Sequence, residues 1–250
     1  MEFDTQFYAV AIPAAFIAGF AKGGFGGSAA FVATALLALI IPPVVALGIM
    51  LPLLMLVDFA VLKPFWRKWH WPSAWALMVG AMPGIALGVL LFRVANPDVL
   101  RILIGLVSLA FVAFQMAQNR GLVSQPERPF DTKIGLLAGL ASGFITFVSH
   151  AGGPLTAIYL LSLGLKKTTY QATTVLVWWV INVARAVPYA FLGVFTYDTL
   201  RADLIMAPAA LIGAAAGVYA HKLMPERWFF AVTYVLLLGA GGKLILDGVS

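Results

Sequence analysis

Two glycine-rich breaks decide how this chain folds: AKGGFGGS at residues 21–28 and SHAGGP at residues 149–154. The first break separates the apolar runs Phe7–Phe20 and Ser28–Ile41, and the second separates Lys133–Ser149 and Pro154–Leu163. About 15 residues of helix extend roughly 22 Å, less than the roughly 30 Å of hydrocarbon in a bilayer. We therefore expect each pair of short runs to enter the bilayer, turn at its glycines and return.

The composition places the chain in a membrane. Its 250 residues are 62% hydrophobic and only 10% charged, and the mean hydropathy is +0.97. A soluble domain carries about 25% charged residues, so the apolar excess must face lipid. Only helices and closed barrels satisfy every backbone group in lipid, and the apolar runs here are continuous rather than alternating. The sequence therefore predicts an all-α polytopic membrane protein.

Several classes of function are excluded by what the sequence lacks. The chain has no cysteine, which rules out disulfides, thiolate catalysis and cysteine metal sites. The net charge of +6 comes from basic residues in short loops rather than a stripe, so we expect no nucleic-acid partner. The sequence has no P-loop, His-Glu-x-x-His or Gly-x-Ser-x-Gly motif. We expect neither an enzyme nor a cofactor or metal site.

The chain reads as two repeats of about 125 residues. Residues 1–118 form the first transmembrane repeat, 119–132 a polar cytoplasmic linker and 133–250 the second repeat. Each repeat has about five helical segments, of which the first two form the broken hairpin. The longer runs are Val44–Leu62, Trp71–Phe92, Val99–Gln118, Thr168–Leu192, Leu204–Ala220 and Trp228–Leu246. Asn96-Pro97-Asp98 is typical of a helix start, and the matched glycines at 84, 88, 213 and 217 indicate close helix packing.

The charges indicate that the repeats are inverted. The loop after the second short run is uncharged in the first half, Pro42-Pro43, and basic in the second, Lys166-Lys167. Because cytoplasmic loops are rich in Lys and Arg, we predict that both termini lie outside. This arrangement puts ten of the sixteen basic residues inside: Lys63, Arg67, Lys68, Arg120, Arg128, Lys133, Lys166, Lys167, Lys222 and Arg227. Inverted repeats with broken helices are common among secondary transporters.

The two breaks predict an anion site. Ser28 and Pro154 each begin the second arm of a hairpin, where free backbone N–H groups and the helix dipole attract anions. Lys22 adds a positive charge, and His150 adds a donor. Such a cavity would suit a tetrahedral or pyramidal oxyanion. The candidate substrate-binding residues are Lys22, Gly23, Gly24, Gly26, Gly27, Ser28, Ser149, His150, Gly152, Gly153, Asn182 and Arg185.

The charged residues within apolar runs have alternative explanations. Lys22 either touches substrate or pairs with Asp58, and His150 is either a ligand or a structural donor. We expect Asp58 and Arg185 to lie on opposite sides of the cavity, Asp58 as a proton acceptor or gate and Arg185 as an outer gate. Either could instead belong to a structural ion pair. Asn182 lies one turn before Arg185 and shares its helix face.

Around these two breaks the chain resembles the sulfite exporter TauE/SafE family of membrane transporters. Residues 19–27 match the family's first glycine-rich turn through its glycines at 23, 24, 26 and 27, and residues 147–154 match the second through Gly152 and Gly153. Ser149-His150 departs from a plain glycine run. The resemblance implies passage of small sulfur-containing anions, including sulfite and organosulfonates, across the bacterial cytoplasmic (inner) membrane.

Together these observations predict a secondary transporter that exports sulfite or an organosulfonate by alternating access. An anion channel and a scaffold subunit without transport of its own are the alternatives. The expected partners are a small anion and the lipid bilayer, with protons as the candidate coupling ion. A homo-oligomer is compatible with the sequence.

Overall fold

The computed structural model describes residues 3–24, 29–123, 127–220 and 226–249, and all side chains in these ranges except those of residues 64 and 226–230. Within these ranges the chain forms ten α-helices and one short 3₁₀-helix, and no strand. The elements are α1 (Thr5–Gly24), α2 (Val32–Ala38), α3 (Pro43–Leu62), η1 (Lys63–Phe65), α4 (Trp71–Val94), α5 (Pro97–Asn119), α6 (Thr132–Ser149), α7 (Gly153–Leu161), α8 (Lys167–Phe191), α9 (Tyr197–Ala220) and α10 (Glu226–Val249). The predicted all-α class is confirmed.

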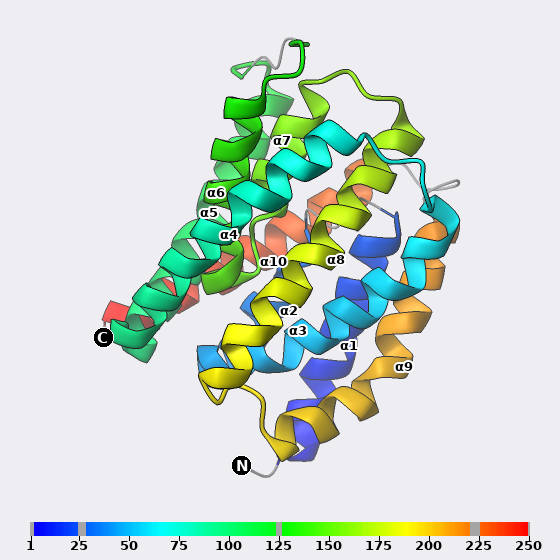
Figure 1. Cartoon of the computed structure of the whole chain (residues 1–250). Coiled ribbons are helices and arrows are strands. Elements are labelled where there is room, and N and C mark those ends of the chain that lie inside the picture. The colour runs from blue at the N-terminus through cyan, green and yellow to red at the C-terminus, as the bar shows by residue number, and fades with distance from the viewer. Residues whose placement is uncertain (1–2, 25–28, 124–126, 221–225, 250) are drawn as a thin grey trace.

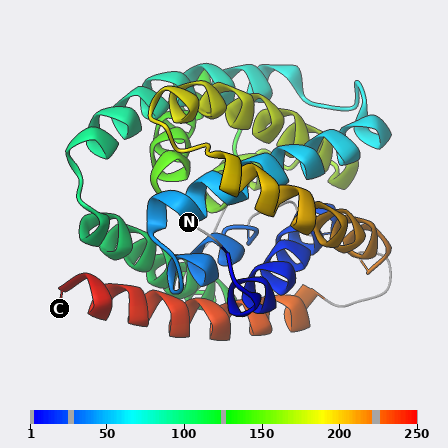
Figure 2. The same cartoon turned by 90° about the horizontal axis from the view of Figure 1, so that it is seen from below.

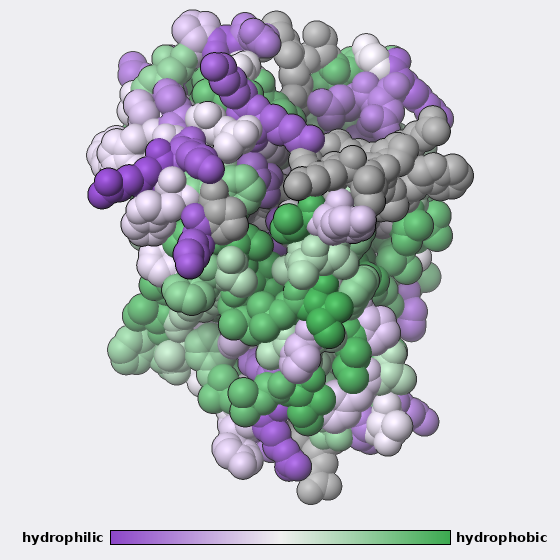
Figure 3. All heavy atoms as spheres, turned by 90° about the vertical axis from the view of Figure 1, so that its right-hand side faces the viewer, coloured by the Kyte–Doolittle hydropathy of each residue, from purple (hydrophilic) through white to green (hydrophobic). Residues whose placement is uncertain are grey.

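Eight of these helices are long and apolar enough to cross a membrane: α1, α3, α4, α5, α6, α8, α9 and α10 from Ala231. The other two, α2 with 7 residues and α7 with 9, are too short to cross. On the face that Figure 3 shows, apolar residues form a band across the middle, with hydrophilic residues above and below it. The protein is therefore a polytopic membrane protein.

The first arm of each broken hairpin is longer than the sequence suggested. α1 has 20 residues and α6 has 18, so both can span, and the expectation that both arms of each hairpin are too short is wrong for these two. α1 extends the predicted run Phe7–Phe20 by two residues before it and by four after it, through Gly24, whereas α6 begins one residue before Lys133 and ends at Ser149 as predicted. Both helix starts are capped. The backbone N–H of Phe7 donates to Asp4 Oδ1 at 2.8 Å, and that of Lys133 donates to Asp131 Oδ1 at 2.7 Å. A cap adds helix where the sequence is not apolar.

Two helix pairs, α1 with α9 and α4 with α6, make the most extensive contacts between helices in the described part of the chain (Figures 1 and 2). A Cβ placed on Gly84 of α4 would lie 2.1 Å from the carbonyl oxygen of Leu140, and one on Gly213 of α9 would lie 2.2 Å from that of Phe16. No side chain fits at such a distance, so these backbones touch. The prediction that the glycines at 84, 88, 213 and 217 are packing positions is confirmed.

Both glycine-packed pairs are parallel. Gly80 and Gly84 meet Leu136 and Leu140 in the same order along the two chains, and Gly213 and Gly217 meet Phe16 and Phe20 likewise. Each pair joins a helix from α1–α5 to a helix from α6–α10, and the roles of the two groups are exchanged between the pairs. This is the pairing expected of a repeat related by a two-fold axis. The inverted repeat itself stays a prediction.

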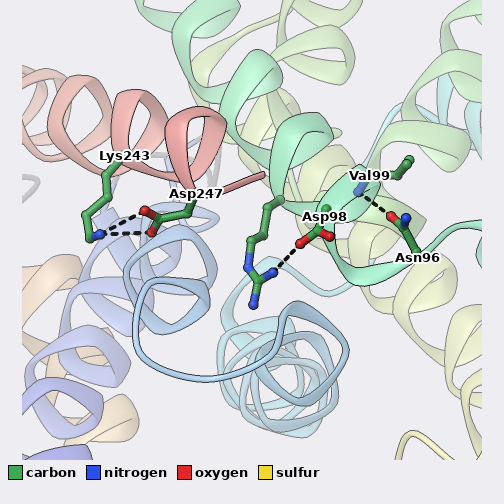
Figure 4. A network of polar contacts seen from close by, with 6 residues as sticks. Asn96, Asp98, Val99, Lys243 and Asp247 are labelled. Atoms are coloured by element: carbon green, nitrogen blue, oxygen red, sulfur yellow. Dashed lines mark hydrogen bonds and ion pairs between the residues drawn. The ribbon is translucent and has the colours of Figure 1, made fainter. Parts of the chain in front are cut away.

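The remaining helices flank these pairs. α5 packs on α10, while α3 and α8 pack on each other and on α9 and α4 respectively. α5 begins as predicted, because the side chain of Asn96 accepts a 2.8 Å hydrogen bond from the backbone N–H of Val99. Exposed ion pairs lie nearby, Arg101–Asp98 at 2.5 Å and Lys243–Asp247 at 2.9 Å (Figure 4).

The connections sort to opposite ends of the molecule. The α5–α6 and α7–α8 connections lie at the upper end in Figure 1, and the N-terminus and the α8–α9 connection lie at the lower end. The sequence assigns the first group to the cytoplasm and the second to the outside. The structure thus separates the two groups of loops; which face is cytoplasmic remains a prediction.

Candidate functional site

Five polar side chains come together deep inside the bundle, and we call them the polar cluster: Lys22 of α1, Asp58 of α3, Asn182 and Arg185 of α8, and His150 at the end of α6. All five are buried, and none is more than 7% exposed. Polar groups are expensive to bury within a membrane protein unless they are paired, so the cluster needs either complete pairing or a function.

Lys22 and Asp58 form an ion pair, with Nζ 2.5 Å from Oδ1. Lys22 also donates to the carbonyl oxygen of Leu54 at 3.3 Å. The second carboxylate oxygen of Asp58 accepts a 2.6 Å hydrogen bond from Nδ2 of Asn182. Both oxygens of Asp58 are therefore occupied, and of the two explanations for Lys22 the structure contains the pairing with Asp58.

Arg185 belongs to the same network. Its Nη2 donates to Oδ1 of Asn182 at 2.6 Å, and its Nη1 donates to the carbonyl oxygen of Thr146. The expectation that Asp58 and Arg185 lie on opposite sides of a cavity is wrong, because Asn182 bridges them. The predicted shared face of Asn182 and Arg185 is confirmed. Arg185 also satisfies the C-terminal end of α6, where a cation is favoured by the helix dipole.

His150 ends α6 in a left-handed conformation, with φ of 58°. Such a conformation is uncommon for a residue other than glycine and costs on the order of 1 kcal/mol or more. The ring Nδ1 lies 3.1 Å from the hydroxyl of Thr34 on α2, and the ring stacks on Tyr189 at a centroid distance of 6.5 Å. The backbone N–H of His150 and Nη1 of Arg185 both donate to the carbonyl oxygen of Thr146.

Two nitrogen atoms in the polar cluster are left over. Nε2 of His150 and Nε of Arg185 are buried and have no hydrogen-bond partner in the described part of the chain. Buried nitrogen atoms without partners are rare in native proteins, since each costs about 1–3 kcal/mol. Both unpaired nitrogens therefore lie near the C-terminal end of α6, one on His150 and the other on Arg185 of α8, which bonds to Thr146.

The described glycines of the breaks have packing roles. A Cβ on Gly23 would lie 2.1 Å from the carbonyl oxygen of Ala214, and one on Gly24 would lie 2.6 Å from that of Gly217, both in α9. A Cβ on Gly152 would lie 2.9 Å from the indole of Trp178. Gly153 is buried at the first position of α7. A role for these glycines in substrate binding stays a prediction.

The other predicted site residues are not part of the polar cluster as described. The hydroxyl of Ser149 donates to the carbonyl oxygen of Ile145 at 2.8 Å and accepts from the N–H of Ala151 at 3.4 Å, so it serves the end of its own helix. Gly26, Gly27 and Ser28 lie outside the residues that the structure describes.

Two residues of the site were missed from the sequence. Thr34 lies within an apolar run and carries no signal of its own. Tyr189 donates from its hydroxyl to the carbonyl oxygen of Phe147 at 2.5 Å and so supports the same helix end as Arg185. It stands one turn after Arg185, and that spacing could have identified it.

A pocket of about 120 Å³ lies elsewhere, between α1 and α10, and its lining residues are Phe16, Ile17, Phe20, Val232, Thr233 and Leu236. Its wall is almost entirely apolar, so it does not suit an anion. Among the described residues, no three His, Asp or Glu side chains lie close enough together to hold a metal ion. The polar cluster is therefore the site at which a small polar ligand would find partners.

Compared with models of protein families, the chain matches the one described as Sulfite exporter TauE/SafE over residues 11–244. Comparison with curated proteins and with solved structures gives no match.

Proposed function

Because the chain belongs to the sulfite exporter TauE/SafE family, a family of membrane transporters, we propose that it exports a small sulfur-containing oxyanion. The substrate is sulfite or an organosulfonate, the membrane is the bacterial cytoplasmic (inner) membrane, and the mechanism is alternating access. The observation that carries this proposal is the unbalanced positive charge of the polar cluster.

The charges of the polar cluster do not cancel. Lys22 and Asp58 neutralise each other in their ion pair, and Arg185 then remains as a buried cation whose hydrogen bonds go to neutral groups, Asn182 and the carbonyl of Thr146. An isolated buried charge costs several kcal/mol. A bound monovalent anion would supply the missing charge, which supports an anion as substrate.

The two unpaired nitrogens support the same site. If the Thr34 hydroxyl donates to Nδ1 of His150, the ring carries its proton on Nε2, which then faces a ligand as a donor. Nε of Arg185 is a second donor, held by a guanidinium group that two hydrogen bonds already fix in place. Two fixed donors and a positive charge suit an oxyanion, whose oxygens accept hydrogen bonds.

Alternating access fits the burial of the cluster. All five side chains are closed off from solvent in this structure, so a substrate can reach them only if helices move. The helices that carry them come from both parts of the sequence, α1 and α3 from the first and α6 and α8 from the second. Movement of these helices relative to one another would open the cluster to one side of the membrane at a time.

The membrane potential by itself already favours export of a monovalent anion. An inside-negative membrane potential favours outward movement of one negative charge by about 2.3 kcal/mol per 100 mV. The potential thus contributes to export whether or not a proton moves together with the anion.

The test is the thermal stability of the detergent-purified protein with sulfite, sulfate, thiosulfate, methanesulfonate or chloride at equal ionic strength. A ligand present at a hundred times its dissociation constant should add about 2.7 kcal/mol to the free energy of unfolding. We expect selective stabilisation by sulfite or a sulfonate, and its loss in His150→Asn. Asparagine tolerates the left-handed conformation and can still reach Thr34, but it lacks Nε2.

His70→Asn is the matched control, because His70 caps α4 and bonds to Ser73 and Thr173 away from the cluster. It should keep the ligand effect. Equal shifts for all anions, or a shift that persists in His150→Asn, would contradict the proposed site. Counterflow of labelled substrate in proteoliposomes then separates a transporter from its rivals, since a channel gives no counterflow and a scaffold subunit gives no flux.

A further inference from the structure

A second buried carboxyl group lies outside the polar cluster. Asp203 is in α9, a candidate membrane span, and is only 7% exposed. Both of its carboxylate oxygens are buried, and neither has a hydrogen-bond partner among the described residues. Asp58, in contrast, has both oxygens occupied by Lys22 and Asn182.

Among the described residues, no charged side chain bonds to Asp203. Its helix neighbours Ala202 and Met206 are fully buried, and the hydroxyl of Thr199, one turn earlier, donates to the carbonyl oxygen of Thr196 instead. α9 packs on α1 and α3. The ionisable side chains that the structure describes on these three helices are Tyr8, Lys22, Asp58, Tyr197, Asp198, Arg201, Tyr219 and Asp203 itself, and Asp4 lies just before α1. None of them bonds to Asp203.

An ionised carboxylate cannot be stable in this position. Moving an isolated carboxylate into a low-dielectric interior without a partner costs far more than moving the neutral acid, so the group binds a proton instead. Burying a protonated carboxyl group without hydrogen-bond partners costs much less free energy than burying the carboxylate. The geometry therefore indicates that Asp203 is neutral while α1, α3 and α9 are packed around it.

We infer that Asp203 is the proton-binding site that couples transport to the proton gradient, an inference that rests on the proposed transport function. When the helices around it separate, water stabilises the carboxylate, the O–H bond breaks and the proton passes to water. When they close, the carboxylate takes up a proton again. One proton is thus bound and released in each cycle, with no other reactant.

The position of Asp203 separates this site from the polar cluster. Gly19 packs on Ala210, and α1 and α9 are parallel. Asp203 lies two turns before Ala210 and Lys22 about one turn after Gly19, so the two sites are about 15 Å apart along the helices. Asp203 lies toward the end of the molecule where α1 and α9 begin, which is the end that the sequence predicts to be outside. Opening at that end would wet Asp203.

The experiment uses purified protein in proteoliposomes with a pH-sensitive dye inside. Methanesulfonate and thiosulfate are the probes, because both are anions of strong acids and carry no proton themselves. We expect an anion gradient to drive proton movement in the wild-type protein. In Asp203→Asn that movement should fall to the level of protein-free vesicles, while anion counterflow continues, because counterflow requires no net proton transfer.

Asp247→Asn is the matched control, because Asp247 is an exposed carboxylate in α10 that pairs with Lys243. It should behave as the wild type. Proton movement that persists in Asp203→Asn, or its absence in a wild-type protein that performs counterflow, would overturn the inference. Failure of counterflow in the wild-type protein would instead count against the transport function.

A measurement that needs neither transport nor a stable variant keeps the inference testable. Infrared spectroscopy of the wild-type protein in lipid at neutral pH should show the C=O stretch of a protonated carboxylic acid. The band should disappear in Asp203→Asn and remain in Asp247→Asn. A wild-type protein with no protonated carboxyl group at neutral pH contradicts the proton site, whatever the flux assays give.

Discussion

Lys22 and Asp58 neutralise each other inside the bundle, so we expect the loss of either one alone to cost more stability than the loss of both. Lys22→Ala leaves the carboxylate of Asp58 buried with only Asn182 as a partner, which should destabilise the protein by about 3–5 kcal/mol. Asp58→Leu leaves a buried lysine and should cost a similar amount. Lys22→Met combined with Asp58→Leu removes both charges, and should recover most of the lost stability.

Denaturation in a fixed detergent measures these three variants against the wild type. The double variant should also keep oxyanion stabilisation if the ion pair only supports the site, because His150 and Arg185 remain. Additive losses in the double variant would mean that the two side chains do not interact as the 2.5 Å distance implies.

At the scale of single residues, the sequence predicts which residues form the polar cluster better than it predicts how they are arranged. Lys22, Asp58 and Arg185 are identifiable because a charge inside an apolar run is costly and needs a reason. Their arrangement was not predictable, because the bridge through Asn182 depends on how α3 and α8 cross. Thr34 could not be identified from the sequence, because a threonine within an apolar helix does not by itself indicate a functional site.

At the scale of helices, the glycine contacts make opposite predictions for two similar substitutions. Gly84→Ala places a Cβ against the carbonyl oxygen of Leu140, so α4 and α6 must move apart, which should cost about 1–3 kcal/mol. Gly239→Ala in α10 meets nothing within 4 Å and should stabilise the helix by up to about 1 kcal/mol. Thermal denaturation of the two variants tests this difference of sign. Equal effects would mean that α4 and α6 are not in backbone contact.

Helix lengths were predicted less well than helix positions. Hydropathy located every long helix, but it began the first arms of both hairpins too late, because Asp4 and Asp131 cap helices that start at Thr5 and Thr132. It also ended α1 at Phe20 instead of Gly24. The glycines at 23 and 24 look like a turn in the sequence. They stay helical because α9 packs against them, and tertiary packing of that kind leaves no local signal.

At the scale of the whole molecule, the predicted orientation can be tested with single cysteines, because the chain has none of its own. Tyr197 is 81% exposed at the start of α9, and Leu122 is 75% exposed after α5. In intact cells, a membrane-impermeant thiol reagent should label Tyr197→Cys and should leave Leu122→Cys unlabelled until the membrane is permeabilised. The reverse pattern would invert the whole topology, and equal labelling would contradict the separation of the two ends.

The pairing of α1 with α9 and of α4 with α6 also sets an order of assembly. α1 is made first by the ribosome, yet its glycine face has no partner until α9 has left the translocon near the end of synthesis. Until α9 is inserted, the glycine face of α1 therefore lies in the bilayer without its partner helix. Lipid or an insertion factor must cover the exposed backbone during that time. A chain cut between α5 and α6 would consist of two fragments, each presenting the surface that the other needs.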